Sequence, residues 1–150
     1  MAKDIILNHI SEAFKDVKLE DGISISQARL MDDYRDTKEN IKNARSIDNE
    51  QSWTEISKDK LEKLYDAITF LDAKGLRFYL PAYMAYGILY PDTGFPIGDY
   101  AISQLEGDTM ERYHIFSPEQ KVVIKEFLEF TLGEGDYFDT EIALKALEYW

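Results

Sequence analysis

The chain has 150 residues and a formal net charge of −12, because it contains 29 Asp and Glu residues but only 17 Lys and Arg residues. This length is typical of one domain, and a composition that is 45% hydrophobic and 31% charged excludes a disordered or collagen-like chain. The acidic balance argues against nucleic acid as a ligand, and the lack of cysteine excludes disulfides, thiolate nucleophiles and cysteine zinc sites.

The first third of the chain predicts three helices. Apolar residues recur at the helical period over 3–17, and the Ser24-x-x-Gln27 pattern is typical of a capping box that starts a second helix near residue 25. Apolar content falls between Asp32 and Ser52, so we expect a short exposed helix at 38–45 followed by a loop. The segment 36–52 is therefore predicted to be a mobile loop region within a single domain.

The middle of the chain predicts a helix, a turn and a second helix. Ser57 is a candidate N-cap for a helix that carries apolar residues on one face as far as Leu71. Asp72 and Gly75 suit the first and fourth positions of a type I turn. Residues 77–80 are expected to be extended, since the following proline disfavours the helical region, and Pro81 would then begin a helix over 81–90.

The C-terminal part contains one segment without a clear pattern and two further helices. Residues 91–116 are rich in Gly, Pro and Asp, which suits either a long loop or a small two-stranded element. Ser117 to Gln120 forms a capping box with proline at the first helical position, so we predict a helix over 118–132. A final helix follows Asp139 or Thr140. The expected fold is all-α or α-dominated, a compact bundle of five or six helices with at most a minor sheet.

Motifs for catalysis and cofactor binding are absent from the sequence. The only histidines are His9 and His114, and no nucleophile elbow, zinc protease, P-loop or dinucleotide-binding pattern occurs. The acids between Glu134 and Glu141 do not follow the spacing of an EF-hand loop, so a solvated acidic loop is the simpler interpretation. We therefore predict no metal and no cofactor, and enzymatic activity is disfavoured.

Acidic residues are concentrated late in the chain. Residues 1–76 carry 16 acids and 12 bases, whereas 77–150 carry 13 acids and 5 bases, so the net charges are −4 and −8. Between Lys125 and Lys145 the sequence has six acids and no base: Glu126, Glu129, Glu134, Asp136, Asp139 and Glu141. Such a concentration of charge favours encounter with a basic protein, although acidity kept for solubility would give the same pattern.

Tyrosines are concentrated in the predicted helix 81–90. Because Tyr83, Tyr86 and Tyr90 follow a helical spacing, they share one face. A pocket that includes Arg77 and Tyr79 beside this face would hold an anionic ligand, with a tyrosine hydroxyl as hydrogen-bond donor. The alternative is a tyrosine-rich edge of the core in which Arg77 pairs with a nearby carboxylate.

The stretch from Phe70 to Met84, FLDAKGLRFYLPAYM, resembles the central motif of a family of small, uncharacterised bacterial proteins known as a domain of unknown function. The residues 26–34, 53–56 and 117–120 and the C-terminal Leu-Glu-Tyr-Trp are similar to other parts of that family, so the resemblance covers most of residues 20–150. It implies no activity that could be transferred to individual residues. In size and charge the chain also resembles immunity proteins, which neutralise toxins.

Three functions remain open at this point. The leading hypothesis is a non-catalytic, cytoplasmic binding protein that uses its acidic C-terminal part to engage a basic protein partner, in its sharpest form as an immunity-type inhibitor of a toxin. The second is a small-ligand binder or enzyme with the pocket around Arg77. The third is a protein that associates with itself through the aromatic helix.

Overall fold

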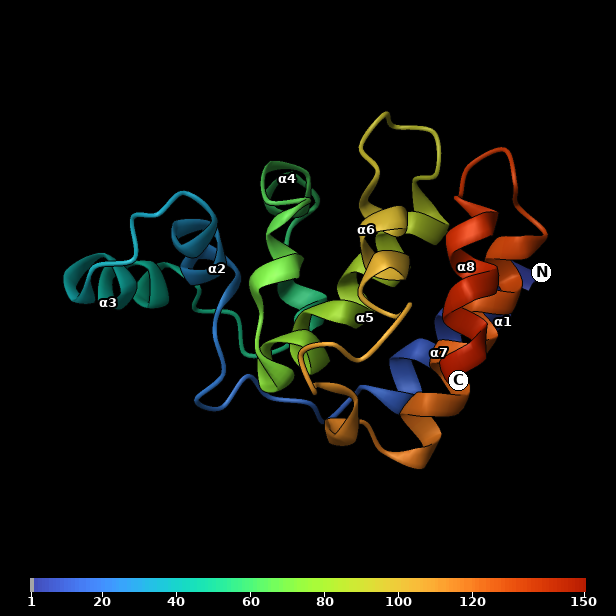
Figure 1. The fold of residues 1–150 in the computed structure, drawn as a ribbon, viewed down its shortest axis with the longest axis horizontal. Coiled ribbons are helices and arrows are strands. Elements are labelled where there is room, and N and C mark those ends of the chain that lie inside the picture. Colours follow the sequence, from blue (N-terminus) through green and yellow to red (C-terminus); the bar gives the residue numbers. More distant parts are fainter. Residues whose placement is uncertain (1) are drawn as a thin grey trace.

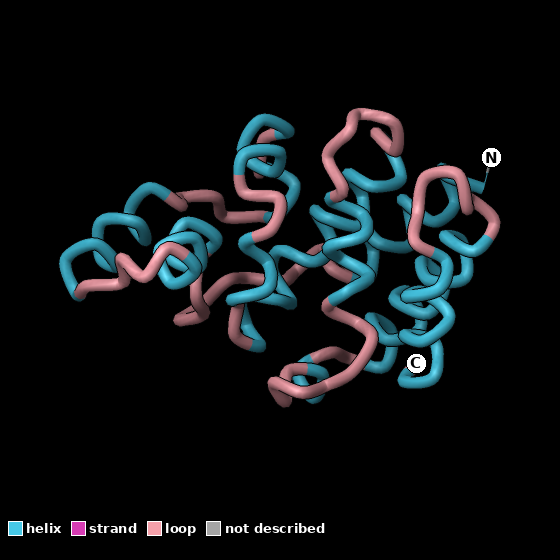
Figure 2. Tube along the Cα trace, turned by 45° about the horizontal axis from the view of Figure 1, so that its top comes forward, coloured by secondary structure: helices cyan, strands magenta, loops and turns pink. Residues whose placement is uncertain are grey.

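Helices provide all of the regular secondary structure of residues 2–150, the part of the chain that the computed structural model describes (Figures 1 and 2). The α-helices are α1 (Ala2–Ala13), α2 (Ile25–Asp32), α3 (Lys38–Ile47), α4 (Lys58–Lys63), α5 (Ala73–Leu89), α6 (Ile97–Ser103), α7 (Pro118–Leu132) and α8 (Thr140–Ala146). The 3-10 helices are η1 (Trp53–Glu55), η2 (Ala67–Phe70), η3 (Tyr113–Ile115) and η4 (Leu147–Tyr149).

The predicted α-dominated fold is confirmed, and the number of short helices is larger than expected. Residues 91–116 contain α6 and η3, and no strand occurs among residues 2–150, so the two-stranded alternative for this segment was wrong. No helix in this described part of the chain combines the length and the apolar character that a membrane span requires.

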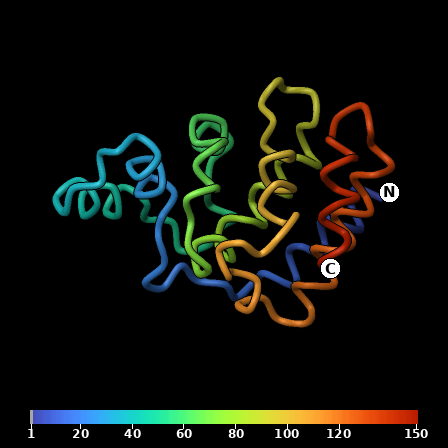
Figure 3. The backbone as a smooth tube through the Cα atoms, viewed as in Figure 1, coloured from blue at the N-terminus to red at the C-terminus, as the bar shows by residue number. Residues whose placement is uncertain are grey.

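Helix α5 lies at the centre of the molecule, with α2 and α3 at one end and α1, α7 and α8 at the other (Figure 1). It contacts α1, α6 and three of the 3-10 helices, and most of its 17 residues are buried. The chain returns to the α1 and α7 end at its C-terminus (Figure 3). Because the core forms around α5, most of the other elements contact α5 or contact an element that touches it.

The start of α5 differs from the sequence prediction. Asp72 is not the first residue of a turn: it is the N-cap of α5, and its Oδ1 accepts hydrogen bonds from the backbone N–H of Gly75 at 2.9 Å and of Ile23 at 3.0 Å. Residues 77–80 are helical rather than extended, and Pro81 lies inside α5. Burial of Phe78 and of the apolar residues around the proline outweighs the hydrogen bond that proline cannot donate.

Two predicted helices are shorter in the structure. The first ends at Ala13 rather than at residue 17, although Phe14 and Val17 are buried as their spacing indicates. The helix expected as far as Leu71 ends at Lys63, and η2 follows it. The carbonyl of Leu64 accepts a hydrogen bond from the hydroxyl of Tyr83 at 2.6 Å, which satisfies the backbone where α4 stops.

The short helix predicted at 38–45 is present as α3, and the loop after it is anchored. The buried carboxylate of Asp48 accepts from the backbone and hydroxyl of Ser26, both at 2.7 Å, and pairs with Lys60 at 2.6 Å. Lys60 also reaches Glu50 at 2.8 Å. Although burial lowers the pKa of Lys60, these two carboxylates raise it above its ordinary value. The mobility predicted for 36–52 stays a prediction, whereas its C-terminal end is tied to α2 and α4.

Helices α5 and α6 pack closely against each other at two glycines, Gly87 and Gly98. A Cβ at Gly87 would lie 2.9 Å from the Cα of Gly98, and a Cβ at Gly98 would lie 2.5 Å from the ring of Phe138. Phe138 belongs to the connection between α7 and α8 and is buried. Because Gly98 has no side chain, the ring of Phe138 lies directly on α6. This contact positions the connection between α7 and α8 against α6.

We predict that Gly98→Ala lowers the free energy of unfolding by about 1–3 kcal/mol, since the new methyl group would displace the Phe138 ring from a packed contact. The measurement is urea unfolding followed by circular dichroism. Gly133→Ala is the matched control, because Gly133 has a right-handed φ of −80° and its Cβ would meet nothing closer than 3.5 Å. Equal losses in the two variants would contradict this account of the crossing.

We predict that Asp72→Ala costs about 1–2 kcal/mol, because it leaves an N-terminal N–H of α5 and the N–H of Ile23 without their acceptor. Asp72→Asn retains an oxygen at the same position and should keep most of the stability. Thermal unfolding of both variants tests the cap. If the asparagine variant is as unstable as the alanine variant, the charge rather than the hydrogen bonds is what matters.

Candidate functional site

The first candidate surface is the acidic hairpin, which we define as α7, α8 and the connection between them with Glu129, Glu134, Asp136, Asp139 and Glu141. Helix α7 begins with the predicted capping box: the hydroxyl of Ser117 accepts from the N–H of Gln120 at 3.1 Å, and the Gln120 side chain accepts from the N–H of Ser117 at 3.0 Å. The helix ends at Leu132, as predicted; Gly133 is its C-cap, with a right-handed φ of −80° instead of the left-handed conformation expected for a glycine at this position.

The connection of the acidic hairpin is held at two points. Phe138 packs edge to face on Phe127, with ring centroids 6.3 Å apart, and covers Gly98 of α6. Asp139 caps α8, because its Oδ1 accepts from the N–H of Ile142 at 3.1 Å. The carboxylates of this segment therefore project from a fixed backbone.

Five of the six acids of the predicted surface form no ion pair within the described part of the chain. Glu126, the sixth acid of the predicted surface, is the exception: its oxygens lie 2.8 and 2.9 Å from Nδ1 of His9. None of the five acids of the hairpin forms an ion pair with a Lys, Arg or His side chain in residues 2–150. The C-terminal end of α7 adds the negative end of its helix dipole to this region.

Asp99 of α6 adds a further carboxylate next to the hairpin. Its Oδ1 accepts a hydrogen bond from the backbone N–H of Asp139 at 2.8 Å. Burial raises the pKa of Asp99, and the charge of Asp139 raises it further against the opposing effect of that hydrogen bond. The raised pKa of Asp99 therefore reflects mainly the burial of its carboxyl group, with a smaller contribution from the negative charge of Asp139.

The pocket predicted from Arg77 and four tyrosines is not assembled in that form. Arg77 pairs with Glu20 at 2.5 Å, rather than with Asp72, and lies away from the tyrosine hydroxyls. Tyr79 and Tyr83 are fully buried, and burial raises the pKa of both hydroxyls. These two tyrosines therefore belong to the core, which agrees with the alternative interpretation of the aromatic run.

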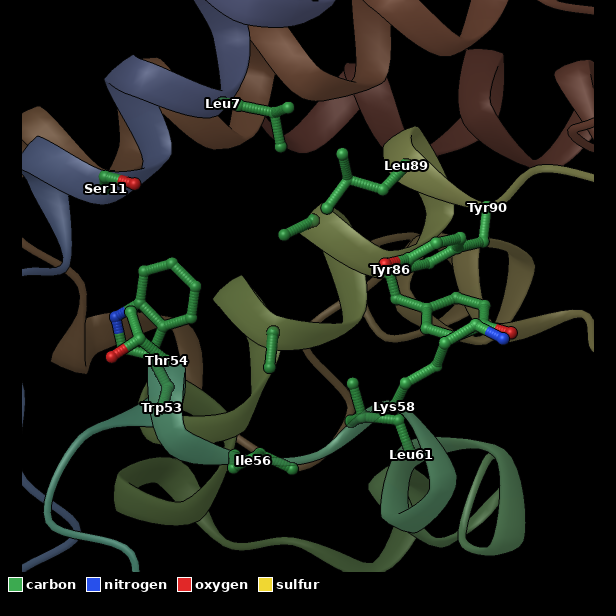
Figure 4. Close-up of a pocket in the computed structure, with 12 residues that line it drawn as sticks. Leu7, Ser11, Trp53, Thr54, Ile56, Lys58, Leu61, Tyr86, Leu89 and Tyr90 are labelled. Atoms are coloured by element: carbon green, nitrogen blue, oxygen red, sulfur yellow. The ribbon is translucent and has the colours of Figure 1, made fainter.

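Tyr86 and Tyr90 line the second candidate surface, an open cleft of about 450 Å³ between α1, η1, α4 and α5, which we call the apolar cleft (Figure 4). Most of its surface comes from aliphatic and aromatic side chains. They include Leu7, Trp53, Ile56, Leu61, Leu89 and Tyr90. Clefts of this size and character are typical of binding sites.

A polar group closes one end of the apolar cleft. Lys58 Nζ lies 3.2 Å from a carboxylate oxygen of Glu62 and 4.9 Å from the centre of the Tyr90 ring. The Tyr86 hydroxyl donates to Glu62 and lies 2.9 Å from the hydroxyl of Thr93. Burial and the contact with Glu62 raise the pKa of Tyr86 to about 12, so at neutral pH this hydroxyl acts as a hydrogen-bond donor and keeps its proton.

Sequence reasoning missed Lys58 and Trp53 as residues that line the apolar cleft, and Glu62 as the partner of Lys58 and Tyr86. Lys58 and Glu62 carry a recognisable signal, since they stand four residues apart in a predicted helix. Their proximity to Tyr90 depends on how α4 packs against α5, which no local pattern encodes. Among residues 2–150, no group of three or more His, Asp or Glu side chains is arranged to hold a metal ion.

We predict that Asp99→Asn stabilises the protein at neutral pH, because the folded chain raises the pKa of Asp99 and so disfavours its charged form. The gain should shrink as the pH falls through the raised pKa and vanish in acid, where the wild-type carboxyl is also neutral. Urea unfolding at a series of pH values is the measurement, with the exposed Asp136→Asn as the charge-matched control. A gain that does not change with pH would contradict the prediction.

Comparison with known proteins gives one family match and no other match. No curated protein and no solved structure matches the chain. One family does match, and its description reads "Family of unknown function (DUF6714)". The match extends over residues 2–150 and so includes the motif at 70–84, the acidic hairpin and every element that lines the apolar cleft. The chain therefore belongs to this family of unknown function.

Proposed function

We propose that this protein is a non-catalytic binding module that engages a basic protein partner through the acidic hairpin. The observation that carries the proposal is that Glu129, Glu134, Asp136, Asp139 and Glu141 have no cationic partner within residues 2–150, on a connection fixed by Phe138. A cationic partner would break no existing ion pair when it binds these five side chains.

The charge of the whole chain supports the same partner. A net charge of −12 attracts a basic protein over distances of about a Debye length and raises the rate of encounter. Because exposed charges are weakly coupled in water, the hairpin would provide orientation and speed, and apolar contacts would provide most of the affinity. Binding should accordingly weaken as salt is added.

The finer form of the proposal is an immunity-type inhibitor, which would block a basic toxin by covering its active surface. The combination of small size, a fixed acidic hairpin and a cysteine-free composition suits such a protein in the reducing cytoplasm. The alternative function, a ligand pocket around Arg77, has less support because Arg77 is paired and Tyr79 and Tyr83 are buried.

The test compares two variants with equal charge. One neutralises the hairpin, the other neutralises exposed acids elsewhere that also form no ion pair, and each changes the net charge from −12 to −8, since four acids become amides. The hairpin variant is E129Q/E134Q/D136N/E141Q, and the control variant is D36N/E39Q/D59N/E111Q.

We expect the hairpin variant to bind a short poly-L-lysine about tenfold more weakly than wild type, and the control variant to lose about twofold or less, by isothermal titration calorimetry at low salt. The difference should disappear at high salt because the contacts are exposed. Equal losses in the two variants would show that only the net charge matters, and the hairpin would then not be the binding surface.

A further inference from the structure

The apolar cleft is a preformed groove with a floor of buried or small side chains. Leu61 and Tyr86 are at most 6% exposed, and Ala82 and Ala85 of α5 also line the cleft. At the rim, Leu89 is 53% exposed. A cleft of about 450 Å³ with mostly apolar walls and few polar groups is typical of a site for a small molecule.

One cation faces this apolar surface. Of the residues between 2 and 150 that line the cleft, only Lys58 carries a charge. Its side chain is 46% exposed, and its ammonium group lies 4.9 Å from the centre of the Tyr90 ring. An ammonium group has three N–H donors, so the ion pair with Glu62 at 3.2 Å leaves donors for a second acceptor. The cleft therefore offers apolar contacts and a single positive charge.

The ion pair with Glu62 does not exclude an anion from Lys58. Glu62 lies outside the lining of the cleft, and the oxygen that it presents to Lys58 also accepts the hydrogen bond from the Tyr86 hydroxyl. The next lysine of α4 shows that one ammonium can hold two carboxylates here, since Lys60 pairs with Asp48 at 2.6 Å and with Glu50 at 2.8 Å. A ligand carboxylate can therefore join Glu62 on Lys58 without displacing it.

The charged and apolar parts of the cleft lie at different ends. Figure 4 shows Lys58 and Tyr90 at one end and Trp53 at the other. The indole N–H of Trp53 already donates to the carbonyl of Phe14 at 3.0 Å, so Trp53 offers only its ring to an occupant. A ligand that matches both ends is apolar along its length and carries an anionic group at one terminus.

The net charge of the chain favours a small ligand over an anionic macromolecule. A partner with many negative charges would be repelled by a chain with a net charge of −12. A ligand with one negative charge feels mainly the groups within about one Debye length, and Lys58 is the charge that lines the cleft. A carboxylate carries a single charge at neutral pH and so fits this constraint.

We propose that the apolar cleft binds a single-chain monocarboxylate, with its hydrocarbon chain over Ala85 and Leu89 toward Trp53 and its carboxylate on the ammonium group of Lys58. The acidic hairpin contributes no residue to the cleft. The inference therefore goes beyond the proposed function, and either can fail without the other. Glu62 competes with the ligand for the charge of Lys58.

The first test titrates the wild-type protein with octanoate and decanoate by isothermal titration calorimetry, at physiological salt and below the concentration at which each forms micelles. We expect decanoate to bind about tenfold more tightly than octanoate, because its two additional methylene groups are buried on the apolar floor. The neutral control is 1-octanol, which has the same chain length as octanoate and no charge.

The second test removes the cation. Lys58→Gln should weaken octanoate about three- to tenfold and change the affinity for 1-octanol less than about twofold, since only the carboxylate uses the ammonium group. Lys63→Gln is the matched control, because Lys63 is an exposed lysine of the same helix outside the cleft. Glu62→Gln should strengthen octanoate by about two- to threefold, since it removes the competing charge and keeps an oxygen for Tyr86.

The third test places the chain of the ligand. Leu89→Asp should weaken octanoate and 1-octanol alike by about tenfold, because a charge replaces apolar surface at the rim. Leu144→Asp on α8, at a leucine of similar exposure outside the cleft, should change neither affinity. Both positions are exposed, so folding is retained, and circular dichroism of each variant verifies this.

Four results would overturn the inference. They are the absence of any binding of decanoate, equal effects of Lys58→Gln and Lys63→Gln on octanoate, and equal effects of the two aspartate variants. The fourth is a dimer of the protein alone that Leu89→Asp dissociates in sedimentation experiments, which would make a second copy the occupant of the cleft. The variant E129Q/E134Q/D136N/E141Q should bind decanoate at least as well as wild type, so a loss of poly-L-lysine binding in that variant concerns the proposed function alone.

Discussion

Burial of α5 is the constraint on which the rest of this structure depends. A helix of 17 residues that is apolar around most of its circumference must be covered on several sides at once, so helices from both halves of the chain pack against it. The Asp72 carboxylate begins this helix and also holds the N–H of Ile23, which belongs to the segment that leads into α2. One side chain thereby caps the central helix and links its start to the segment that leads into α2.

The same arrangement decides where charge remains available. In the N-terminal half, several acids pair with bases of other segments, as Asp48 pairs with Lys60 and Asp66 with Arg29. The C-terminal part has few bases, and none of the five acids of the acidic hairpin forms an ion pair within residues 2–150. The apolar cleft is a part of α5 that no other described element covers. The acidic hairpin is a segment whose acids form no ion pair with a base in the part of the chain that the structure describes.

Much of the fold could be predicted because local patterns record burial and capping. The capping box of Ser117 and Gln120 predicted the first residue of α7 correctly, and the helix predicted at 38–45 is present as α3. Two predictions at α5 failed for different reasons. At Asp72 a cap and a turn use the same short carboxylate, and at Pro81 the local penalty was smaller than the free energy of burying the surrounding side chains. Local preference therefore identified the core residues better than the boundaries of the helices.

The sequence by itself determined the helical class, the concentration of acids late in the chain and the likeness to a family of unknown function, because composition, periodicity and spacing can be read from the chain without its fold. Only the tertiary structure decided which of the candidate residues face solvent. Tyr83 and Tyr86 lie on the same predicted face of the helix. The hydroxyl of Tyr83 nevertheless donates to the carbonyl of Leu64 in the core, whereas the hydroxyl of Tyr86 donates to Glu62 beside the apolar cleft. Their difference depends on where α4 packs against α5, and contacts between segments this far apart leave no trace in a local pattern.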